Sequence, residues 1–365
     1  METRNFIDGK FITTISKRNI PVLNPANQKI VANIDEALDD EIDLAFNAAK
    51  KAFDQRILLD MDAKKKSKLM RAIASKLREY KTQGAEILSN ENGKTLEQCE
   101  SEFLGAADTY DYYAGLTDKI ENKMIPSGND TFNYIVLEPF GVSLQIVPWN
   151  YPIVIFASMT AQNLIVGNTI VIKPPELCPI SSNFFGKIFE EVGLPKGIVN
   201  IVHGYGEVTG RKLVKHNEVD YIVFTGSPEV ASEILRETSD RIIPCHFELG
   251  GKSAAIIYPD ADIDKAVEST VKGVFKPNAG QICVAMSRVI VHPKIKDEYM
   301  SKLVEKTKQL KIGPGNDPTT EVTPLISTNQ MQRVSNYCKS GVQSGATLTL
   351  GGEQTENDEG NYFQP

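Results

Sequence analysis

The sequence contains few of the residues that build disulfide frameworks and metal sites. It has only five cysteines, four histidines and one tryptophan among 365 residues. The cysteines are odd in number and far apart, with no Cys-x-x-Cys pair, and the histidines show no ligand spacing. The pattern therefore indicates neither a disulfide framework nor a metal site, and free thiols are typical of a reducing compartment.

The sequence also lacks an excess of basic charge and a long unbroken apolar run. Its 40 Lys and Arg residues face 47 Asp and Glu residues, for a formal net charge of −7, which gives no broad surface for nucleic acid. The most apolar stretch, 142–166, is interrupted by Pro148, Asn150, Pro152 and Gln162, and the first residues lack the apolar region of a secretory signal. We therefore expect no nucleic-acid or membrane partner and a cytoplasmic location.

The first third of the chain is predicted to be largely helical. A length of 365 residues corresponds to about two domains. After a hairpin turn at Asp8-Gly9, apolar residues recur at helical spacing within 42–53, 69–92 and 95–116. A strand at 131–138 stands apart from these helices, as in a projecting arm.

From residue 142, short β-branched runs alternate with helical stretches. The expected strands are 142–147, 169–173, 198–202, 221–224, 242–247 and 254–258. The expected helices are 152–166, 181–192, 207–216 and 228–238, and a weaker alternation follows with a helix at 262–275, a strand at 288–292 and a helix at 296–310. Such alternation indicates parallel βαβ units, and a parallel sheet binds ligands beyond the carboxyl ends of its strands.

Two turns after expected strands are candidates for binding a nucleotide. Gly204, Gly206 and Gly210 follow one strand but have the spacing GxGxxxG, which is a weak signal and equally typical of a turn without a ligand. In the second turn Ser227 is expected to cap a helix that begins at Pro228. The free N–H groups and positive dipole end of that helix suit a pyrophosphate, although a capped helix without a ligand is the alternative.

The segment Lys173-Pro174-Pro175-Glu176 ends another expected strand. Its two prolines stiffen the turn and fix the lysine relative to the glutamate. A carboxylate there accepts hydrogen bonds from ribose hydroxyls but repels a 2′-phosphate, by about 4 kcal/mol per charge pair at contact in a partly solvated site. The turn therefore favours NAD over NADP modestly, because the charge of Lys173 offsets part of the repulsion, unless the turn is only a surface ion pair.

Three further residues are candidates for a catalytic site. Cys283 follows a small-residue loop, Asn278-Ala279-Gly280-Gln281, that leaves access to the thiol. Glu248 ends a strand before Gly250-Gly251, so we expect its carboxylate to face an interior cleft, with a salt bridge as the alternative. Asn150 lies between Pro148 and Pro152 and either caps the next helix or presents an amide donor to an oxyanion.

In this order and spacing, the motifs closely resemble the aldehyde dehydrogenase superfamily, with the betaine-aldehyde and broad-specificity branches as the nearest analogy. The similar segments are Phe6-Ile7-Asp8-Gly9-Lys10, Asn24-Pro25-Ala26, Pro148-Trp149-Asn150-Tyr151-Pro152, Lys173-Pro174-Pro175-Glu176, Phe224-Thr225-Gly226-Ser227, Glu248-Leu249-Gly250-Gly251-Lys252, Gly280-Gln281-Ile282-Cys283 and Gly360-Asn361-Tyr362-Phe363-Gln364-Pro365.

The resemblance implies NAD-dependent oxidation of a small-molecule aldehyde to a carboxylic acid. Cys283 would be the nucleophile that forms a thiohemiacetal and then a thioester, Asn150 would form the oxyanion hole with the Cys283 N–H, and Glu248 would activate water. The cofactor, NAD with NADP possible, would be bound by Lys173, Glu176, Gly226, Ser227, Val230, Trp149 and Gly250. Cys283, Asn150 and Glu248 must then lie close together.

The resemblance also implies a Rossmann-like NAD-binding domain of residues 1–122 and 142–249, a β-hairpin oligomerisation arm of residues 123–141 and an α/β catalytic domain of residues 250–365. That catalytic domain is expected to be incomplete, because the family continues with a Glu-Ile-Phe-Gly-Pro motif after the segment that ends here at Pro365. The full-length form is expected to be a homodimer or homotetramer. The alternatives are a non-catalytic remnant that at most binds nucleotide and a thiol hydrolase that uses Cys283.

Overall fold

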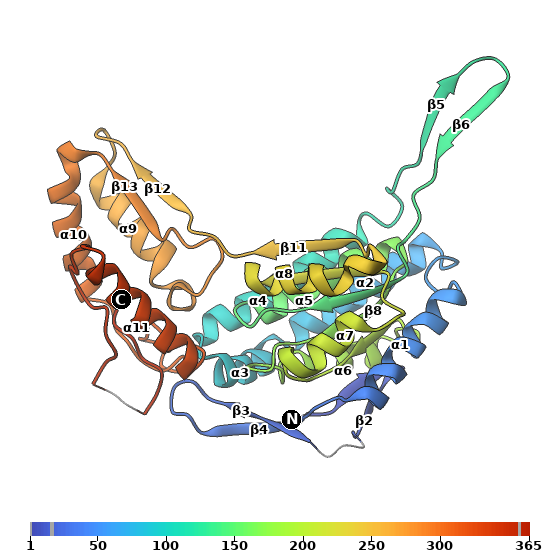
Figure 1. The fold of residues 1–365 in the computed structure, drawn as a ribbon, viewed down its shortest axis with the longest axis horizontal. Coiled ribbons are helices and arrows are strands. Elements are labelled where there is room, and N and C mark those ends of the chain that lie inside the picture. The colour runs from blue at the N-terminus through green and yellow to red at the C-terminus, as the bar shows by residue number, and fades with distance from the viewer. Residues whose placement is uncertain (1, 15–17, 357–358) are drawn as a thin grey trace.

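Seven strands form one sheet at the centre of the molecule (Figure 1). The computed structural model describes residues 2–14, 18–356 and 359–365. In order across the sheet, the strands are β11 (Cys245–Leu249), β10 (Tyr221–Gly226), β7 (Val142–Ile146), β8 (Thr169–Lys173), β9 (Val199–Ile201), β1 (Asn5–Ile7) and β2 (Lys10–Ile12). The pairs from β11 to β9 are parallel, whereas β1 and β2 add antiparallel strands at the far edge.

Because β7, β8, β9, β10 and β11 are parallel, their carboxyl ends meet at one edge of the sheet. The turns that contain Asn150, Glu176 and Ser227 follow β7, β8 and β10 directly. The α/β fold with a parallel sheet is therefore confirmed, and the sequence motifs lie at the edge where such sheets bind ligands.

Helices cover both faces of this sheet. They are α1 (Asp39–Asp54), α2 (Ala63–Glu79), α3 (Lys81–Asn92), α4 (Leu96–Ala114), α5 (Pro152–Val166), α6 (Asn183–Glu191), α7 (Arg211–Lys215) and α8 (Pro228–Thr238). Side chains alternate along β8, so Ile170 and Ile172 pack into the core beneath α2 to α6, while Val171 packs into the core beneath α1, α7 and α8. Strands buried on both faces explain the continuous apolar runs in the sequence.

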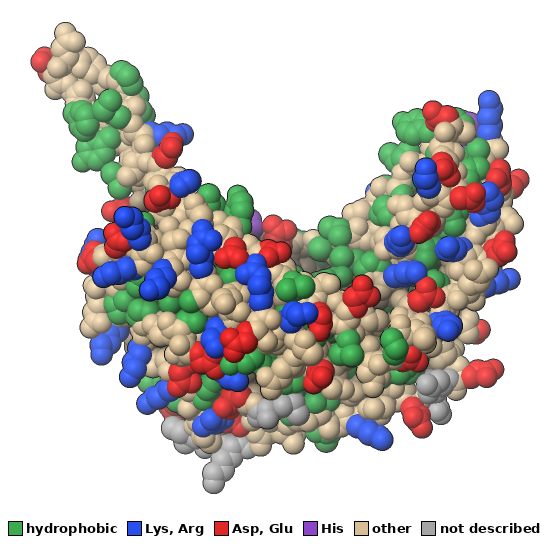
Figure 2. Space-filling view, turned by 180° about the vertical axis from the view of Figure 1, so that it is seen from behind, with side chains coloured by type: hydrophobic (Ala, Val, Ile, Leu, Met, Phe, Trp, Pro, Cys, Tyr) green, Lys and Arg blue, Asp and Glu red, His purple; other side chains and the backbone are tan. Residues whose placement is uncertain are grey.

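A second lobe follows β11. It contains β12 (Ala254–Ile257) and β13 (Arg288–Val291), which pair in parallel, with α9 (Ile263–Val274), α10 (Lys296–Lys308) and α11 (Thr328–Gln343). Figure 1 shows that β11 leads from the main sheet into this lobe, and Figure 2 shows the open hollow between the lobe and a projecting hairpin. That hairpin consists of β5 (Lys123–Ser127) and β6 (Thr131–Ile135). No helix among the described residues is both long and apolar enough to cross a membrane.

Most of the predicted elements are present, but three differ from the expectation. The strand expected at 242–247 is β11, which begins later at Cys245, because the chain turns through Ser239–Arg241 and Ile242 has a positive φ of 52°. The hairpin of β3 (Asn19–Leu23) and β4 (Ile30–Asp35) and helix α11 were not predicted. Met331, Val334 and Cys338 recur at helical spacing and could have indicated α11, although none of its side chains is fully buried. The domain boundaries stay predictions.

Candidate functional site

The turn between β7 and α5 holds Asn150 against the segment that leads to Cys283. Helix α5 begins at Pro152 after Tyr151, which makes no side-chain cap, so Asn150 is not the helix cap that the sequence allowed as an alternative. Its Oδ1 accepts from the Tyr151 N–H at 3.0 Å. Its Nδ2 donates to the carbonyl oxygen of Gln281 at 3.1 Å, two residues before Cys283.

The loop before Cys283 has a strained backbone that neighbouring side chains hold in place. Asn278 and Ala279 have φ values of 47° and 52°, and Gly280 follows at 79°, so three successive residues are left-handed. Gln281 anchors the loop, because its Nε2 donates to the Asn278 carbonyl at 2.9 Å and its Oε1 accepts from the Ile326 N–H at 3.1 Å. Such strain persists where the surroundings determine it, as they commonly do at functional sites.

Accessibility distinguishes Cys283 from the buried cysteines. Cys283 is exposed, whereas Cys99 and Cys178 are buried. Burial raises the pKa of the Cys99 thiol to about 12 and raises the pKa of Cys178 as well, so both remain protonated and inert. Burial first, and the proximity of Cys283 second, raise the pKa of the Tyr151 hydroxyl, so the exposed thiol lies in the electrostatic neighbourhood of the residue after Asn150.

Glu248 lies on β11, beside Thr225 of β10. Its Oε1 is 3.2 Å from His246 Nε2, and its side chain is 68% exposed. The expectation that the carboxylate faces an interior cleft is therefore wrong for this structure, because β11 is an edge strand with no neighbour beyond it in the described sheet. The chain after Glu248 still reaches the thiol loop, since a Cβ on Gly251 would lie 3.9 Å from the carbonyl oxygen of Cys283.

Lys173 and Glu176 form one side of the sheet edge. The buried Lys173 Nζ lies 3.0 Å from Glu176 Oε2. Burial by itself raises the pKa of the Glu176 carboxyl. The Lys173 charge and backbone N–H groups, including that of Gly206, together lower this pKa by more, so it lies below its usual value. The turns after β8 and β9 thus meet around an ionised carboxylate that is well placed for a polar ligand.

The N-terminus of α8 forms the neighbouring part of this edge. Ser227 is the predicted cap, since its Oγ accepts from the Val230 N–H at 3.3 Å and Pro228 is the first helical residue. Any side chain at Gly226 would collide with the ring of Phe224, so the strand end requires glycine. Val230 is exposed, which leaves an apolar surface beside the helix end.

Trp149 lies in the turn after β7, and Gly250 directly follows β11. The Trp149 carbonyl accepts from Asn92 Nδ2 at 2.7 Å and from the Cys178 thiol at 3.3 Å. A Cβ on Gly250 would meet no atom within 4 Å, so this position is open. Of the sequence candidates, the structure therefore joins Asn150 to the Cys283 loop through Gln281 and joins the Glu248 strand to it through Gly251.

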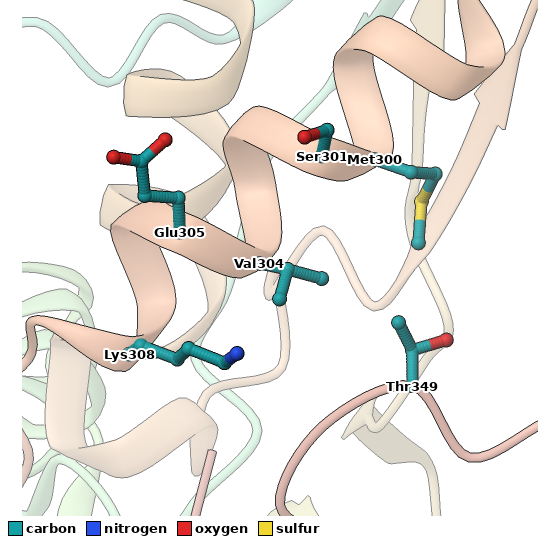
Figure 3. A pocket seen from close by; sticks show the side chains of 6 residues that line it. All are labelled: Met300, Ser301, Val304, Glu305, Lys308 and Thr349. Carbon is teal, nitrogen blue, oxygen red and sulfur yellow. The ribbon is translucent and has the colours of Figure 1, made fainter.

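Two pockets lie outside this edge. One, of about 910 Å³, lies between α4 and the 315–321 loop and is also lined by Tyr151 and by Val154 of α5, so it begins beside the turn that carries Asn150. The other, of about 410 Å³, lies on α10 and is lined by Met300, Ser301, Val304, Glu305, Lys308 and Thr349 (Figure 3). This α10 pocket contains none of the site residues.

Sequence reasoning missed the buried charges behind Asn150. Lys94 and Glu102 are both buried and pair with each other, and the Lys94 Nζ donates to the Asn150 carbonyl at 3.0 Å. Asn278 Nδ2 donates to the same carbonyl at 3.1 Å. The only sequence signal is a lysine directly after the helix-ending Gly93, and that position is usually exposed.

Comparison with known proteins identifies the fold and its family. Residues 11–365 match the model of the aldehyde dehydrogenase family, and the chain belongs to this family. It is 36% identical to the betaine aldehyde dehydrogenase of Bacillus subtilis over 364 residues, which cover 99% of this chain and 74% of that protein. It is 39% identical to human retinal dehydrogenase 2, with 96% and 68% of the two chains covered.

Solved structures agree with these sequence relatives. The NAD⁺ complex of the aldehyde dehydrogenase from Bacillus cereus superimposes with a TM-score of 0.96 at 36% identity, and it covers all of this chain and 74% of that chain. A NAD⁺ complex of betaine aldehyde dehydrogenase from Staphylococcus aureus gives a TM-score of 0.97 at 34% identity. This chain thus spans about three quarters of the length of these relatives.

Proposed function

We propose that this chain oxidises a small-molecule aldehyde to a carboxylic acid with NAD as the cofactor. The observation that carries the proposal is the hydrogen bond from the Asn150 amide to Gln281, two residues before the exposed Cys283. This bond holds the Asn150 amide, in the turn after β7, against the loop that carries the accessible Cys283 thiol. Membership of the aldehyde dehydrogenase family supports the same chemistry.

Cys283 acts as the nucleophile. Its thiolate sulfur bonds to the aldehyde carbon, and the carbonyl electron pair moves to the oxygen to give a thiohemiacetal oxyanion. Asn150 stabilises that oxyanion together with the Cys283 N–H. An amide has two N–H donors, and only one is used by the Gln281 carbonyl, so the other remains for the oxyanion.

Glu248 completes the reaction as a general base. NAD, when bound, supplies the hydride acceptor that converts the thiohemiacetal into a thioester. Glu248 then removes a proton from water, whose oxygen attacks the thioester carbon while the carbon–sulfur bond breaks and the thiolate leaves. His246, at 3.2 Å from the Glu248 carboxylate, is the neighbour that orients this base.

The edge formed by β7 to β11 binds the cofactor. Glu176, kept ionised by Lys173, accepts hydrogen bonds from the adenosine ribose, and the N–H groups at the start of α8 near Ser227 bind the pyrophosphate. Val230 contacts the adenine. Gly226, Trp149 and Gly250 line the same edge, and the Glu176 charge favours NAD over NADP because it repels a 2′-phosphate.

The arm and the domains belong to the same proposal. We infer an NAD-binding domain of residues 1–122 and 142–249, an arm of residues 123–141 that contacts another subunit, and a catalytic domain of residues 250–365. Exposed apolar side chains on both arm strands, including Met124 and Phe132, support an oligomer.

The decisive experiment measures NADH formation by this chain with a panel of aliphatic, aromatic and ammonium-bearing aldehydes, alongside NAD binding by calorimetry. The expected result is NADH formation with at least one aldehyde. Binding of NAD without oxidation of any aldehyde would support the non-catalytic alternative, which the exposed position of Glu248 favours. Ester hydrolysis without a need for NAD would instead support a thiol hydrolase.

A further inference from the structure

A buried ion pair lies directly behind the turn that carries Asn150. Lys94 stands between α3 and α4, and its side chain is fully buried. Its ammonium pairs with Glu102 of α4, donates to the Asn150 carbonyl at 3.0 Å and lies 4.5 Å from the centre of the Tyr151 ring. The last two of these contacts are with the turn between β7 and α5.

Glu102 fixes the other end of the same turn. Its Oε2 accepts from the N–H of Ile153, in the first turn of α5, at 3.2 Å. One buried carboxylate therefore binds both the start of α5 and the ammonium that holds the Asn150 carbonyl. The Lys94–Glu102 pair thus fixes the orientation of the backbone at both Asn150 and Ile153.

The Asn150 carbonyl also links this pair to the thiol loop. It accepts from Lys94 Nζ and from Asn278 Nδ2, while the Asn150 side chain donates to Gln281. Lys94 and the strained loop before Cys283 thus share one acceptor. A shift of this backbone carbonyl would rotate the peptide unit next to the Asn150 Cα and would so redirect the side chain that carries the amide donor.

Stability gives no sufficient reason for such a pair. Replacing a buried ion pair by apolar groups of similar volume is often neutral or stabilising, because desolvation of the two charges offsets their attraction. Burial lowers the pKa of Lys94 to about 8, which reflects that desolvation. We therefore attribute the presence of the Lys94–Glu102 pair to the geometry that it imposes on the turn.

We propose that Lys94, held by Glu102, is a positioning residue that orients Asn150 toward the carbonyl oxygen of the substrate. This inference rests on the proposed function, since it deepens the role assigned to Asn150. Lys94 acts through the backbone carbonyl of Asn150 and touches neither the aldehyde nor the cofactor.

The chain offers a matched control for this lysine. Lys66 is also buried, and its Nζ donates to the carbonyl of Ile165 at 3.3 Å, at the opposite end of α5. The 15 residues between Asn150 and Ile165 correspond to about 22 Å of helix. Lys66 thus binds the same helix through the same kind of contact, far from the site.

The first test compares Lys94→Met, the double variant Lys94→Met/Glu102→Gln, and Lys66→Met. Lys94→Met leaves an unpaired buried carboxylate and should lower the melting temperature. The double variant removes both charges, and the amide oxygen of the introduced glutamine can still accept from the Ile153 N–H, so its melting temperature should return close to the wild-type value. Its kcat for aldehyde oxidation should stay about tenfold or more below wild type with an unchanged KM for NAD, while Lys66→Met keeps the wild-type kcat.

The fluorescence of Trp149 provides a second measurement that does not require catalytic activity. Trp149 is the only tryptophan of the chain and precedes Asn150, so its fluorescence reports on this turn alone. Emission and acrylamide quenching should change in the double variant and not in Lys66→Met. A double variant with wild-type kcat, or with unchanged Trp149 fluorescence, would overturn the inference. If the wild type oxidises no aldehyde, the proposed function fails, and the Trp149 comparison alone then decides whether Lys94 positions the turn.

Discussion

Cys283 is the one cysteine whose side chain is exposed, since Cys99 and Cys178 are buried and Cys245 and Cys338 are partly buried. We predict that Cys283→Ala abolishes NADH formation, with at least a thousandfold fall in kcat, because Cys283 is the exposed thiol whose loop is bonded to the Asn150 amide. The half-exposed Cys338 on α11 provides the control, and Cys338→Ala should retain full activity. Steady-state assays with one good aldehyde compare them. Residual turnover in Cys283→Ala above a tenth of wild type would refute the assignment.

The Glu176 carboxylate makes the choice of cofactor testable at one residue. Its low pKa keeps it ionised, so a 2′-phosphate at the ribose would meet a negative charge. We predict that Glu176→Gln raises the ratio of kcat/KM for NADP to that for NAD by roughly tenfold or more. The exposed Glu190 of α6 is the control, and Glu190→Gln should leave the ratio unchanged. An unaltered ratio in Glu176→Gln would place the ribose elsewhere.

Sequence reasoning performed best where a residue's neighbours along the chain determine its structure. Ser227 and Pro228 define a helix start within three residues, and the structure has that cap. Lys94 was missed because its partners, Asn150 and Glu102, meet it only in the folded chain. Buried ion pairs between helices have no local pattern, so the residues that support the site are the hardest to predict.

At the scale of the element, helix α3 is joined to the loop after β8 through one buried carboxylate. Glu91 Oε2 and Oε1 accept from the N–H groups of Ile180 and Ser181 at 2.7 and 2.8 Å. Burial raises the pKa of Glu91 to about 7, above its ordinary value of 4.5. The folded chain therefore keeps this proton to higher pH than the unfolded chain, and its contribution to stability is complete below about pH 4.5 and is lost as the pH rises through 7.

We therefore predict that the unfolding free energy of wild type, relative to Glu91→Gln, falls as the pH rises from 4.5 to 7, by at most about 3 kcal/mol. Glutamine carries no proton that titrates, so the variant lacks this dependence. Denaturant unfolding at several pH values measures the difference. Glu86→Gln, at an exposed position of the same helix, should follow wild type at every pH. A constant difference between wild type and Glu91→Gln would contradict the buried titration.

The elements themselves were predicted with uneven success for a physical reason. The inner strands β7, β8 and β9 of the central sheet are buried on both faces, so their apolar runs are distinct, and β8 has the predicted bounds, Thr169–Lys173. Helix α11 buries no side chain completely and was missed, although Met331, Val334 and Cys338 recur at helical spacing. Burial strengthens such a pattern but is not required for it, since β6 is exposed throughout and still falls within the strand predicted at 131–138.

At the scale of the whole molecule, the hairpin of β5 and β6 projects from the body with an apolar surface (Figure 2). Phe132 and Tyr134 are two residues apart on β6, and their side chains are 73% and 59% exposed. Exposed apolar surface of this kind is typical of an interface between subunits. Every residue of β6 is exposed, so its apolar side chains are available to pack against another subunit.

We predict that the chain exceeds its monomer mass of 40.3 kDa in solution and that Phe132→Ser/Tyr134→Ser converts it to a monomer, because the two rings supply apolar area that binding would bury. Light scattering after size exclusion measures the mass. Tyr112 is an equally exposed aromatic residue on α4, outside the arm, so Tyr112→Ser controls for a general loss of surface aromatics and should keep the wild-type mass. A wild-type monomer, or an oligomer that survives both arm substitutions, would remove the arm from the interface and leave its exposed aromatic residues to a different partner.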